Sequence, residues 1–129
     1  MFLGKYTAQL SDGGRLSIPK KIRREVQNGE VILFTGFEQC IYGFNKNTWQ
    51  ETTRTELEKP FFLDHEGRDI RRKINMTATL ATLDAQSRIV IPDTMLQFTS
   101  ISDAITIIGA GDHFEIWDKK TWEEYSKEL

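Results

Sequence analysis

The stretch Gly14-Arg15-Leu16-Ser17-Ile18-Pro19 returns later in the chain as Ser87-Arg88-Ile89-Val90-Ile91-Pro92. A constant step of 73 residues, the step from Arg15 to Arg88, relates the two copies without a gap. The same step superimposes further identical positions: Leu10 and Leu83, Ile32 and Ile105, Gly36 and Gly109, Trp49 and Trp122. A fixed offset held over a turn, several strands and a tryptophan indicates an internal duplication.

Each copy has the same predicted order of elements, namely strand, turn, strand, short helix, two strands and a final helix. In the first copy, Leu16 and Ile18 alternate with polar residues, which predicts a strand with those two side chains facing a core. Pro19 then ends the strand and suits the first position of a helix. The predicted strands lie at 5–10, 16–18, 31–35, 41–44, 78–83, 88–91, 104–108 and 114–117, and the short helices at 20–27 and 92–98. The two longer helices are expected to begin after the N-caps Asn45 and Asp118.

The expected fold is mixed α+β and mainly β. Each half has roughly 50 residues, and a domain of that size forms a marginal core on its own. We therefore expect a pseudo-twofold β-barrel in which the two halves interleave, with helices at its rim. The expected division is a first repeat with its helix at 1–58, a connecting helical segment at 59–77, which begins where Lys59-Pro60 interrupts the preceding helix, and a second repeat at 78–129.

Composition limits the classes of function. The net charge of −2 gives no overall attraction to nucleic acid, although residues 15–24 hold five basic residues and no acid. The single cysteine, Cys40, excludes an internal disulfide and a Cys-rich zinc site. No apolar run approaches the ~20 residues of a membrane span, and the N-terminus lacks a signal-peptide pattern. We expect a soluble cytoplasmic protein without a membrane partner.

The two copies differ on their surfaces. Four basic residues of the first copy, Lys20, Lys21, Arg23 and Arg24, are replaced by Asp93, Thr94, Leu96 and Gln97. The first copy is therefore predicted to bind anions, and the second to act as scaffold or subunit contact. Exposed apolar side chains are expected to make that contact: Leu96, Phe98 and Ile101.

The basic residues also allow interpretations in which they bind no partner. A charge run taken alone is more often a solvated helix face, but like charges at i,i+4 without an acid favour an anionic partner. Arg15 suits bidentate contact with guanine or a phosphate. The alternative for Arg15 and Arg88 is an ion pair with a turn carboxylate that merely fixes the hairpin, and Asp84 suits that role for Arg88.

No constellation for catalysis is visible, so no enzyme activity, cofactor, metal or small-molecule substrate is expected. His65 and His113 lack a second ligand at metal spacing, and surface or loop roles are expected for both. Cys40 is predicted to be a buried or half-buried small residue, and the two repeated tryptophans to be core anchors. A second helix is expected within residues 61–75, and its basic residues are interpreted as a solvated face: Arg68, Arg71, Arg72 and Lys73.

The repeated turn and strand resemble those of the MraZ family of bacterial regulators of the division and cell-wall gene cluster. Asp84-Ala85-Gln86-Ser87-Arg88 fits the family signature of an aspartate, three residues and an arginine before a strand that ends in proline. The resemblance covers essentially the whole chain, from Met1-Phe2-Leu3-Gly4 to Thr121-Trp122. The first copy departs from the signature, because Ser11 takes the aspartate position and Asp12 follows one place later.

The resemblance implies that each half is an AbrB-like swapped-hairpin domain, and that subunits assemble into a ring-like homo-oligomer. It also implies a nucleoid-associated transcriptional regulator, without catalysis, that binds repeated promoter boxes in double-stranded DNA. The alternative is an antitoxin-like or scaffolding module whose main partner is a protein. The candidate DNA-binding residues are Gly14, Arg15, Lys20, Lys21, Arg23, Arg24 and Arg88, with Asp12 and Asp84 as residues of the turn motif.

Overall fold

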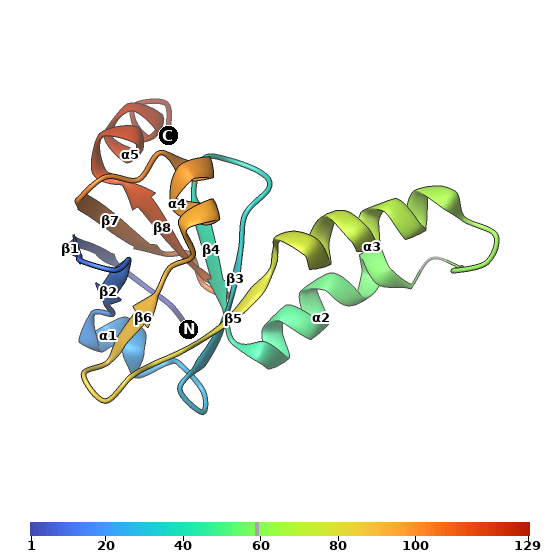
Figure 1. The fold of residues 1–129 in the computed structure, drawn as a ribbon, viewed down its shortest axis with the longest axis horizontal. Coiled ribbons are helices and arrows are strands. Elements are labelled where there is room, and N and C mark those ends of the chain that lie inside the picture. Colours follow the sequence, from blue (N-terminus) through green and yellow to red (C-terminus); the bar gives the residue numbers. More distant parts are fainter. Residues whose placement is uncertain (59) are drawn as a thin grey trace.

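The computed structural model describes residues 1–58 and 60–129, without the side chains of residues 55–57 (Figure 1). The predicted interruption at Lys59–Pro60 therefore lies partly outside the described residues. The strands are β1 (Lys5–Ser11), β2 (Arg15–Ser17), β3 (Glu30–Phe34), β4 (Ile41–Phe44), β5 (Thr79–Thr82), β6 (Arg88–Val90), β7 (Ala104–Gly109) and β8 (Phe114–Asp118). The helices are α1 (Lys20–Arg23), α2 (Lys46–Leu57), α3 (His65–Thr77), α4 (Asp93–Thr99) and α5 (Lys119–Ser126).

The strands of the described chain form a nearly closed antiparallel barrel in the order β5-β3-β4-β8-β7-β1-β2-β6. Pairs of strands from the two halves alternate around it, because β3 pairs with β5, β4 with β8, β1 with β7 and β2 with β6. The repeat relates the β1–β7 pairing to the β5–β3 pairing. It relates the β2–β6 pairing to itself, and likewise the β4–β8 pairing. The predicted fold class, a pseudo-twofold barrel that is mainly β with helices, is confirmed.

The interior of the barrel holds the main core, which the alternating apolar residues of both copies fill. Leu16 and Ile18 of the first copy and Ile89 and Ile91 of the second are all buried there, as their alternation predicts. Phe114 lies fully buried in the same core, with its ring centroid 5.2 Å from that of Phe2. One continuous core therefore serves both halves.

A second, aromatic core lies on the side of the barrel that carries α2. Its buried members come from β3, β4, β8 and the turn before β4: Phe34, Cys40, Tyr42, Phe44 and Trp117. Trp49 and Trp122 pack against it half-buried, as the repeat predicts for equivalent helices.

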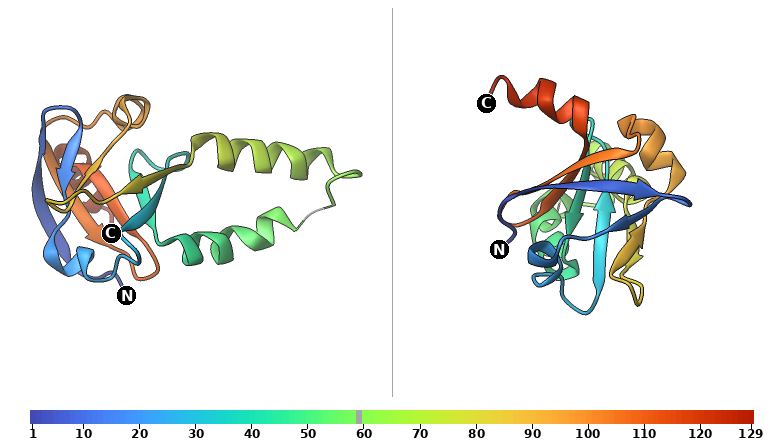
Figure 2. Two further views of the ribbon diagram at one scale, coloured as in Figure 1. Left: turned by 60° about the horizontal axis from the view of Figure 1, so that its bottom comes forward. Right: turned by 90° about the vertical axis from the view of Figure 1, so that its left-hand side faces the viewer.

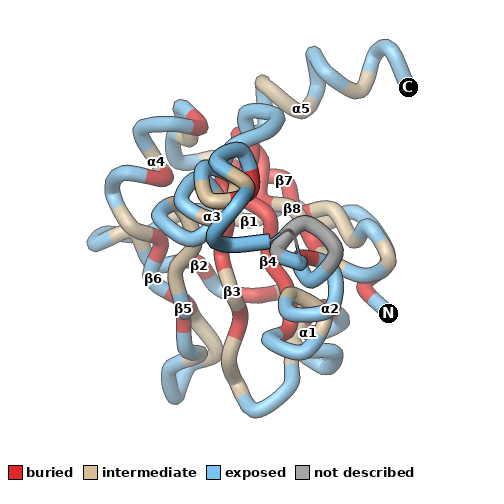
Figure 3. Tube along the Cα trace, turned by 90° about the vertical axis from the view of Figure 1, so that its right-hand side faces the viewer, coloured by how far each residue is buried: buried red, intermediate tan, exposed pale blue. Residues whose placement is uncertain are grey.

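Helices α2 and α3 form a hairpin that projects from the barrel on the side away from β1 and β2 (Figures 1 and 2). Most of its described surface is exposed or half-buried (Figure 3). The expected second helix exists, although α3 begins only at His65. None of the described helices has the length and apolar character that crossing a bilayer would need.

Two local predictions are wrong. The regular helix α1 ends at Arg23 and does not reach residue 27, because the hydrogen bonds that follow it span three residues, as from Glu25 N–H to the Ile22 carbonyl (3.0 Å). The Asn45 side chain does not cap α2. It accepts from Gln27 N–H (2.8 Å) and donates to the Glu25 carbonyl (2.8 Å), so it fastens the connection after α1.

The predicted cap at Asp118 is confirmed, since its carboxylate accepts from Thr121 N–H at 3.4 Å. The same carboxylate also accepts from the backbone and hydroxyl of Ser102, at 3.0 and 2.9 Å.

Candidate nucleic-acid interface

The two arginines of the repeat lie on one short ribbon made by β2 and β6. These strands are antiparallel, with Leu16 opposite Ile89 and Ser17 opposite Arg88. Both apolar residues of this register point into the barrel and are buried. Because side chains alternate along a strand, Arg15 and Arg88 point outward on the same face of the ribbon.

The ribbon is fastened by two equivalent turns. Ile91 N–H donates to the Gly14 carbonyl (2.8 Å), and Ile18 N–H donates to the Ser87 carbonyl (3.1 Å). Gly14 and Ser87 both have positive φ, 71° and 60°. A Cβ at Gly14 would lie 2.8 Å from the Ile91 carbonyl oxygen, so glycine permits the close approach of the strands. The structure thus gives Gly14 a part in positioning the ribbon.

In the second copy, the turn aspartate holds the arginine as its motif predicts. One Asp84 oxygen accepts from the backbone N–H groups of Gln86 (2.8 Å) and Arg88 (2.9 Å). The other oxygen accepts from Arg88 Nε at 3.0 Å. These bonds, above all that from the Arg88 backbone, lower the pKa of Asp84. The hairpin-fixing role of Asp84 and Arg88 is therefore visible in the structure.

In the first copy, no carboxylate of the described residues holds Arg15. Its Nη1 donates to the backbone carbonyl of Asp12 (3.1 Å), and Ser11 Oγ donates to the Arg15 carbonyl (3.0 Å). The Asp12 side chain itself is exposed and makes no ion pair with a described residue. The shift of the aspartate by one position thus leaves the Arg15 guanidinium exposed with its charge uncompensated.

The basic residues that follow Arg15 are also uncompensated. Lys20, Lys21 and Arg24 are exposed on and beside α1, and Arg23 is half-buried. None of the four pairs with an acid among the described residues, and the first turn of α1 contains no acid. A concentration of positive charge next to the ribbon is what an anionic partner would neutralise.

The apolar face predicted on the second copy differs from expectation. Leu96 and Ile101 are half-buried and pack against the main core, because α4 lies with one side on the barrel. Only Phe98 of the three is exposed, with 43% of its surface accessible. Two of the three residues are therefore also core contacts, and the role of the three in subunit contact stays a prediction.

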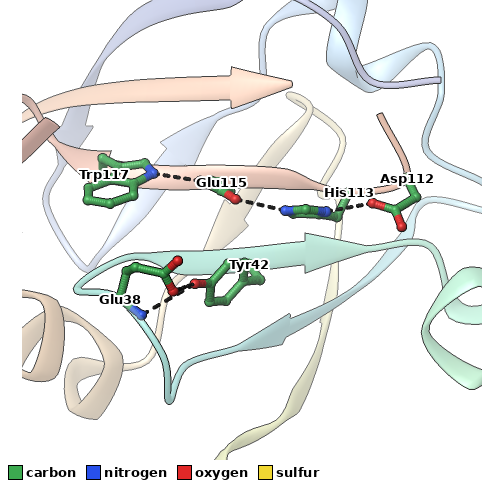
Figure 4. A network of polar contacts seen from close by, with 6 residues as sticks. All are labelled: Glu38, Tyr42, Asp112, His113, Glu115 and Trp117. Atoms are coloured by element: carbon green, nitrogen blue, oxygen red, sulfur yellow. Dashed lines mark hydrogen bonds and ion pairs between the residues drawn. The ribbon is translucent and has the colours of Figure 1, made fainter. Parts of the chain in front are cut away.

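A polar network around His113 was not anticipated from the sequence (Figure 4). His113 Nδ1 lies 2.7 Å from Asp112 and Nε2 lies 2.8 Å from Glu115, which also accepts from Trp117 Nε1 at 2.9 Å. The hydrogen bond to Glu115 is the main cause that raises the pKa of His113. The ring also stacks on Phe44, at 5.2 Å between centroids, so this histidine joins the β7–β8 turn to the aromatic core.

The side chains of Cys40, Tyr42 and His65 are buried or bonded to an acidic side chain. Burial raises the pKa of the Cys40 thiol to about 12, and the prediction of a buried cysteine is confirmed. The Tyr42 hydroxyl donates to the Glu38 carboxylate, while His65 at the start of α3 pairs with Asp69 at 3.2 Å. Within the described part of the chain, no group of His, Cys, Asp and Glu side chains is arranged to hold a metal ion.

The family model and the named relatives that match this chain all belong to one family. The family model described as "MraZ protein, putative antitoxin-like" matches residues 1–73 and 74–129. A protein of Roseiflexus sp. (strain RS-1) named transcriptional regulator MraZ is 37% identical over 123 residues, which cover 95% of this chain and 85% of the relative. A protein of the same name from Clavibacter michiganensis subsp. michiganensis is 36% identical over 125 residues, covering 97% of this chain and 86% of the relative.

Among solved structures, a solution structure from Pyrococcus horikoshii covers 90% of this chain and 88% of its own, at 13% identity and a TM-score of 0.34. That likeness is too low to bear on the fold. The family model matches both halves of the repeat, and named relatives align over nearly the full length. The chain belongs to the MraZ family.

Proposed function

We propose that this chain is a sequence-specific DNA-binding transcriptional regulator that reads repeated promoter boxes through the β2–β6 ribbon. The names of its relatives support a transcriptional regulator and point away from an enzyme. The observation that carries the proposal is the ribbon itself, which presents Arg15 and Arg88 on one outer face next to the uncompensated charge of α1.

The two-stranded form and the chemistry of the ribbon suit the DNA major groove. That groove admits a two-stranded β-ribbon, and arginine recognises guanine O6 and N7 with two hydrogen bonds. Arg15 is better placed than Arg88 to contact a base, because no carboxylate of the described residues competes for the Arg15 guanidinium. Lys20, Lys21, Arg23 and Arg24 then neutralise phosphates and set the register on the duplex.

A single ribbon offers few contacts and would bind weakly. Several copies joined in one homo-oligomer engage several boxes at once, and the second contact then forms at a high effective concentration. We infer that tandem boxes upstream of the division and cell-wall genes are the target, and that the protein works at the nucleoid.

Replacing Arg15 with alanine should weaken specific binding more than replacing Arg88. A bidentate arginine–guanine contact contributes about 1–3 kcal/mol of base discrimination, so the affinity ratio between a box and a scrambled duplex should fall roughly 5- to 150-fold in Arg15→Ala. Arg88→Ala should mainly lower the melting temperature, since Asp84 loses its partner. Gel shifts with the chain's own upstream DNA, beside melting curves, separate the two effects.

The opposite pattern would reverse the roles of the halves. That pattern is loss of specific binding in a stable Arg88→Ala together with an unaffected Arg15→Ala. If neither variant changed specific binding while both changed a cellular activity, the main partner would be a protein, as an antitoxin-like module requires.

The double variant Lys20→Ala with Lys21→Ala should flatten the salt dependence of DNA binding. Each neutralised phosphate adds about 0.9 to the slope of log affinity against log salt, so the slope should fall by about 1.8. Lys119→Ala with Lys120→Ala removes the same charge from exposed positions in α5 and serves as the control. Equal slopes of log affinity against log salt in the two double variants would show that α1 does not contact DNA.

A further inference from the structure

A pocket of about 340 Å³ lies beside the aromatic core, where α2, β4, the β3–β4 connection and the β7–β8 turn meet. Its volume is enough for a small organic molecule. The pocket is lined mainly by aromatic side chains, namely Phe34, Phe37, Tyr42, Phe44 and Trp49. It is called the aromatic pocket below.

The rings of the aromatic pocket form one connected set. The ring centroid of Phe34 lies 5.4 Å from those of Phe37 and Trp49. Trp49 is also 5.4 Å from Phe44, and Phe37 is 5.9 Å from Tyr42. The face of an aromatic ring carries the negative part of its quadrupole and attracts cations. A pocket lined by several rings is the arrangement with which proteins bind quaternary ammonium groups.

The polar end of the pocket carries a net negative charge. Asp112 and His113 line it, and the His113 ring lies between Asp112 at 2.7 Å and Glu115 at 2.8 Å (Figure 4). Two carboxylates and one imidazolium sum to a charge of −1, and the sum is −2 when the imidazole is neutral. The Asp112 side chain remains 62% exposed, so its carboxylate is open to a ligand.

No fixed positive charge opposes these acids. Among the described residues that line the aromatic pocket, none is a lysine or an arginine. Lys73 lines the adjoining pocket and not this one. The Glu38 carboxylate, which accepts from the Tyr42 hydroxyl, adds a further negative charge nearby. The electrostatic field of the pocket therefore favours a positively charged ligand.

His113 does not turn the pocket into an anion site. When the imidazole is protonated, its two N–H groups donate to Asp112 and Glu115, so neither is left for an anionic ligand. An anion would also meet the negative faces of the rings.

We propose that the aromatic pocket binds a small organic cation of the alkylammonium class, with its charged head against the rings and the Asp112 carboxylate beside it. The methyl or methylene groups of such a ligand lose water against the same rings, which adds apolar burial to the attraction of charge. The described residues that line the pocket come from neither α1 nor the β2–β6 ribbon. The site is thus separate from the proposed DNA contact, and the inference does not depend on that function.

The test compares three probes that share a head of three methyl groups and differ in charge: choline, neutral 3,3-dimethylbutan-1-ol and anionic 3,3-dimethylbutanoate. Each is titrated into the full chain by isothermal titration calorimetry, at one ionic strength and in a buffer without organic cations. A cation–π attraction of about 1–2 kcal/mol predicts that choline binds roughly 5- to 30-fold more tightly than the alcohol. The anion should bind most weakly of the three.

Two substitutions test the pocket itself. Phe37→Leu removes one ring and keeps an apolar side chain at a position that is 71% exposed, and Asp112→Asn removes one charge. Each should weaken choline binding severalfold and leave the affinity for the alcohol nearly unchanged. Phe98→Leu and Asp103→Asn make the same changes at exposed positions outside the pocket and should leave choline binding unaltered. Melting curves confirm that each variant is folded.

Four outcomes would overturn the proposal. Equal affinities for choline and the alcohol would show a pocket selective only for apolar shape, and tightest binding of the anion would reverse the sign of the site. Absence of choline binding to the folded wild type would remove the site altogether. Choline affinity unchanged in both folded pocket variants would place the binding elsewhere on the protein.

Discussion

Residues 1–58 and residues 76–129, expressed separately, should each fail to fold as a stable monomer. Four of the seven strand pairings of the described barrel join one half to the other, so a lone half exposes unpaired strands and one side of the shared core. Unpaired strand edges and an apolar face exposed to water both oppose folding. Circular dichroism should show no cooperative melting for either piece at low micromolar concentration.

Mixing the two pieces is the matched control. Together they carry all eight strands of the described barrel, so the mixture should regain cooperative melting. A half that dimerises with itself is compatible with the interleaved topology, because two copies of one half can rebuild the barrel. A monomeric half with a cooperative transition would show that the halves are independent domains.

Phe114→Ala should destabilise the barrel by about 3–5 kcal/mol, the range found for truncating a buried phenylalanine. Phe114 is 0% exposed and packs on Phe2, and a Cβ at Gly43 would overlap its ring. The surrounding β strands are hydrogen-bonded and cannot collapse into the space that the ring leaves. Denaturant unfolding measures the loss, which is a large share of the 5–15 kcal/mol typical of a domain.

Phe98→Ala is the control for that substitution, because Phe98 is 43% exposed on α4. It should cost well under the Phe114 value. If both alanine variants unfolded at the same denaturant concentration, Phe114 would not make the predicted contribution to the stability of the shared core.

The fold could be predicted because duplication makes the sequence its own comparison. Leu16 and Ile89 keep their apolar character while the residues around them change, which separates interior from surface and gives the alternation of each strand. A half too small for its own core then leaves interleaving as the way to bury that surface. Mixed, mainly β architecture follows from those two facts.

The details that could not be predicted depend on contacts between distant segments. Asn45 suits a helix cap, but the backbone of Gln27 lies within reach and competes for its side chain. Leu96 replaces an arginine, which indicates a new surface, whereas the structure turns it onto the core. His113 has acids on both sides in sequence, yet only the hairpin brings Glu115 and Phe44 onto its ring.

The candidate site was partly predictable for a similar reason. The repeat singles out Arg15 and Arg88, and their turn motif predicts the Asp84 contact. Their common face depends on the pairing of β2 with β6, which lie 73 residues apart and carry no local signal for each other.

The interleaving of β1 with β7 and of β3 with β5 has a further consequence. In two separate chains such an exchange of strands would depend on encounter, and dilution would undo it. Here the exchanging partners are tied by a covalent link, so the barrel forms at any expression level, even from a single molecule. One half is then free to diverge from its twin, and a single polypeptide acquires an orientation that a symmetric pair of identical chains cannot have.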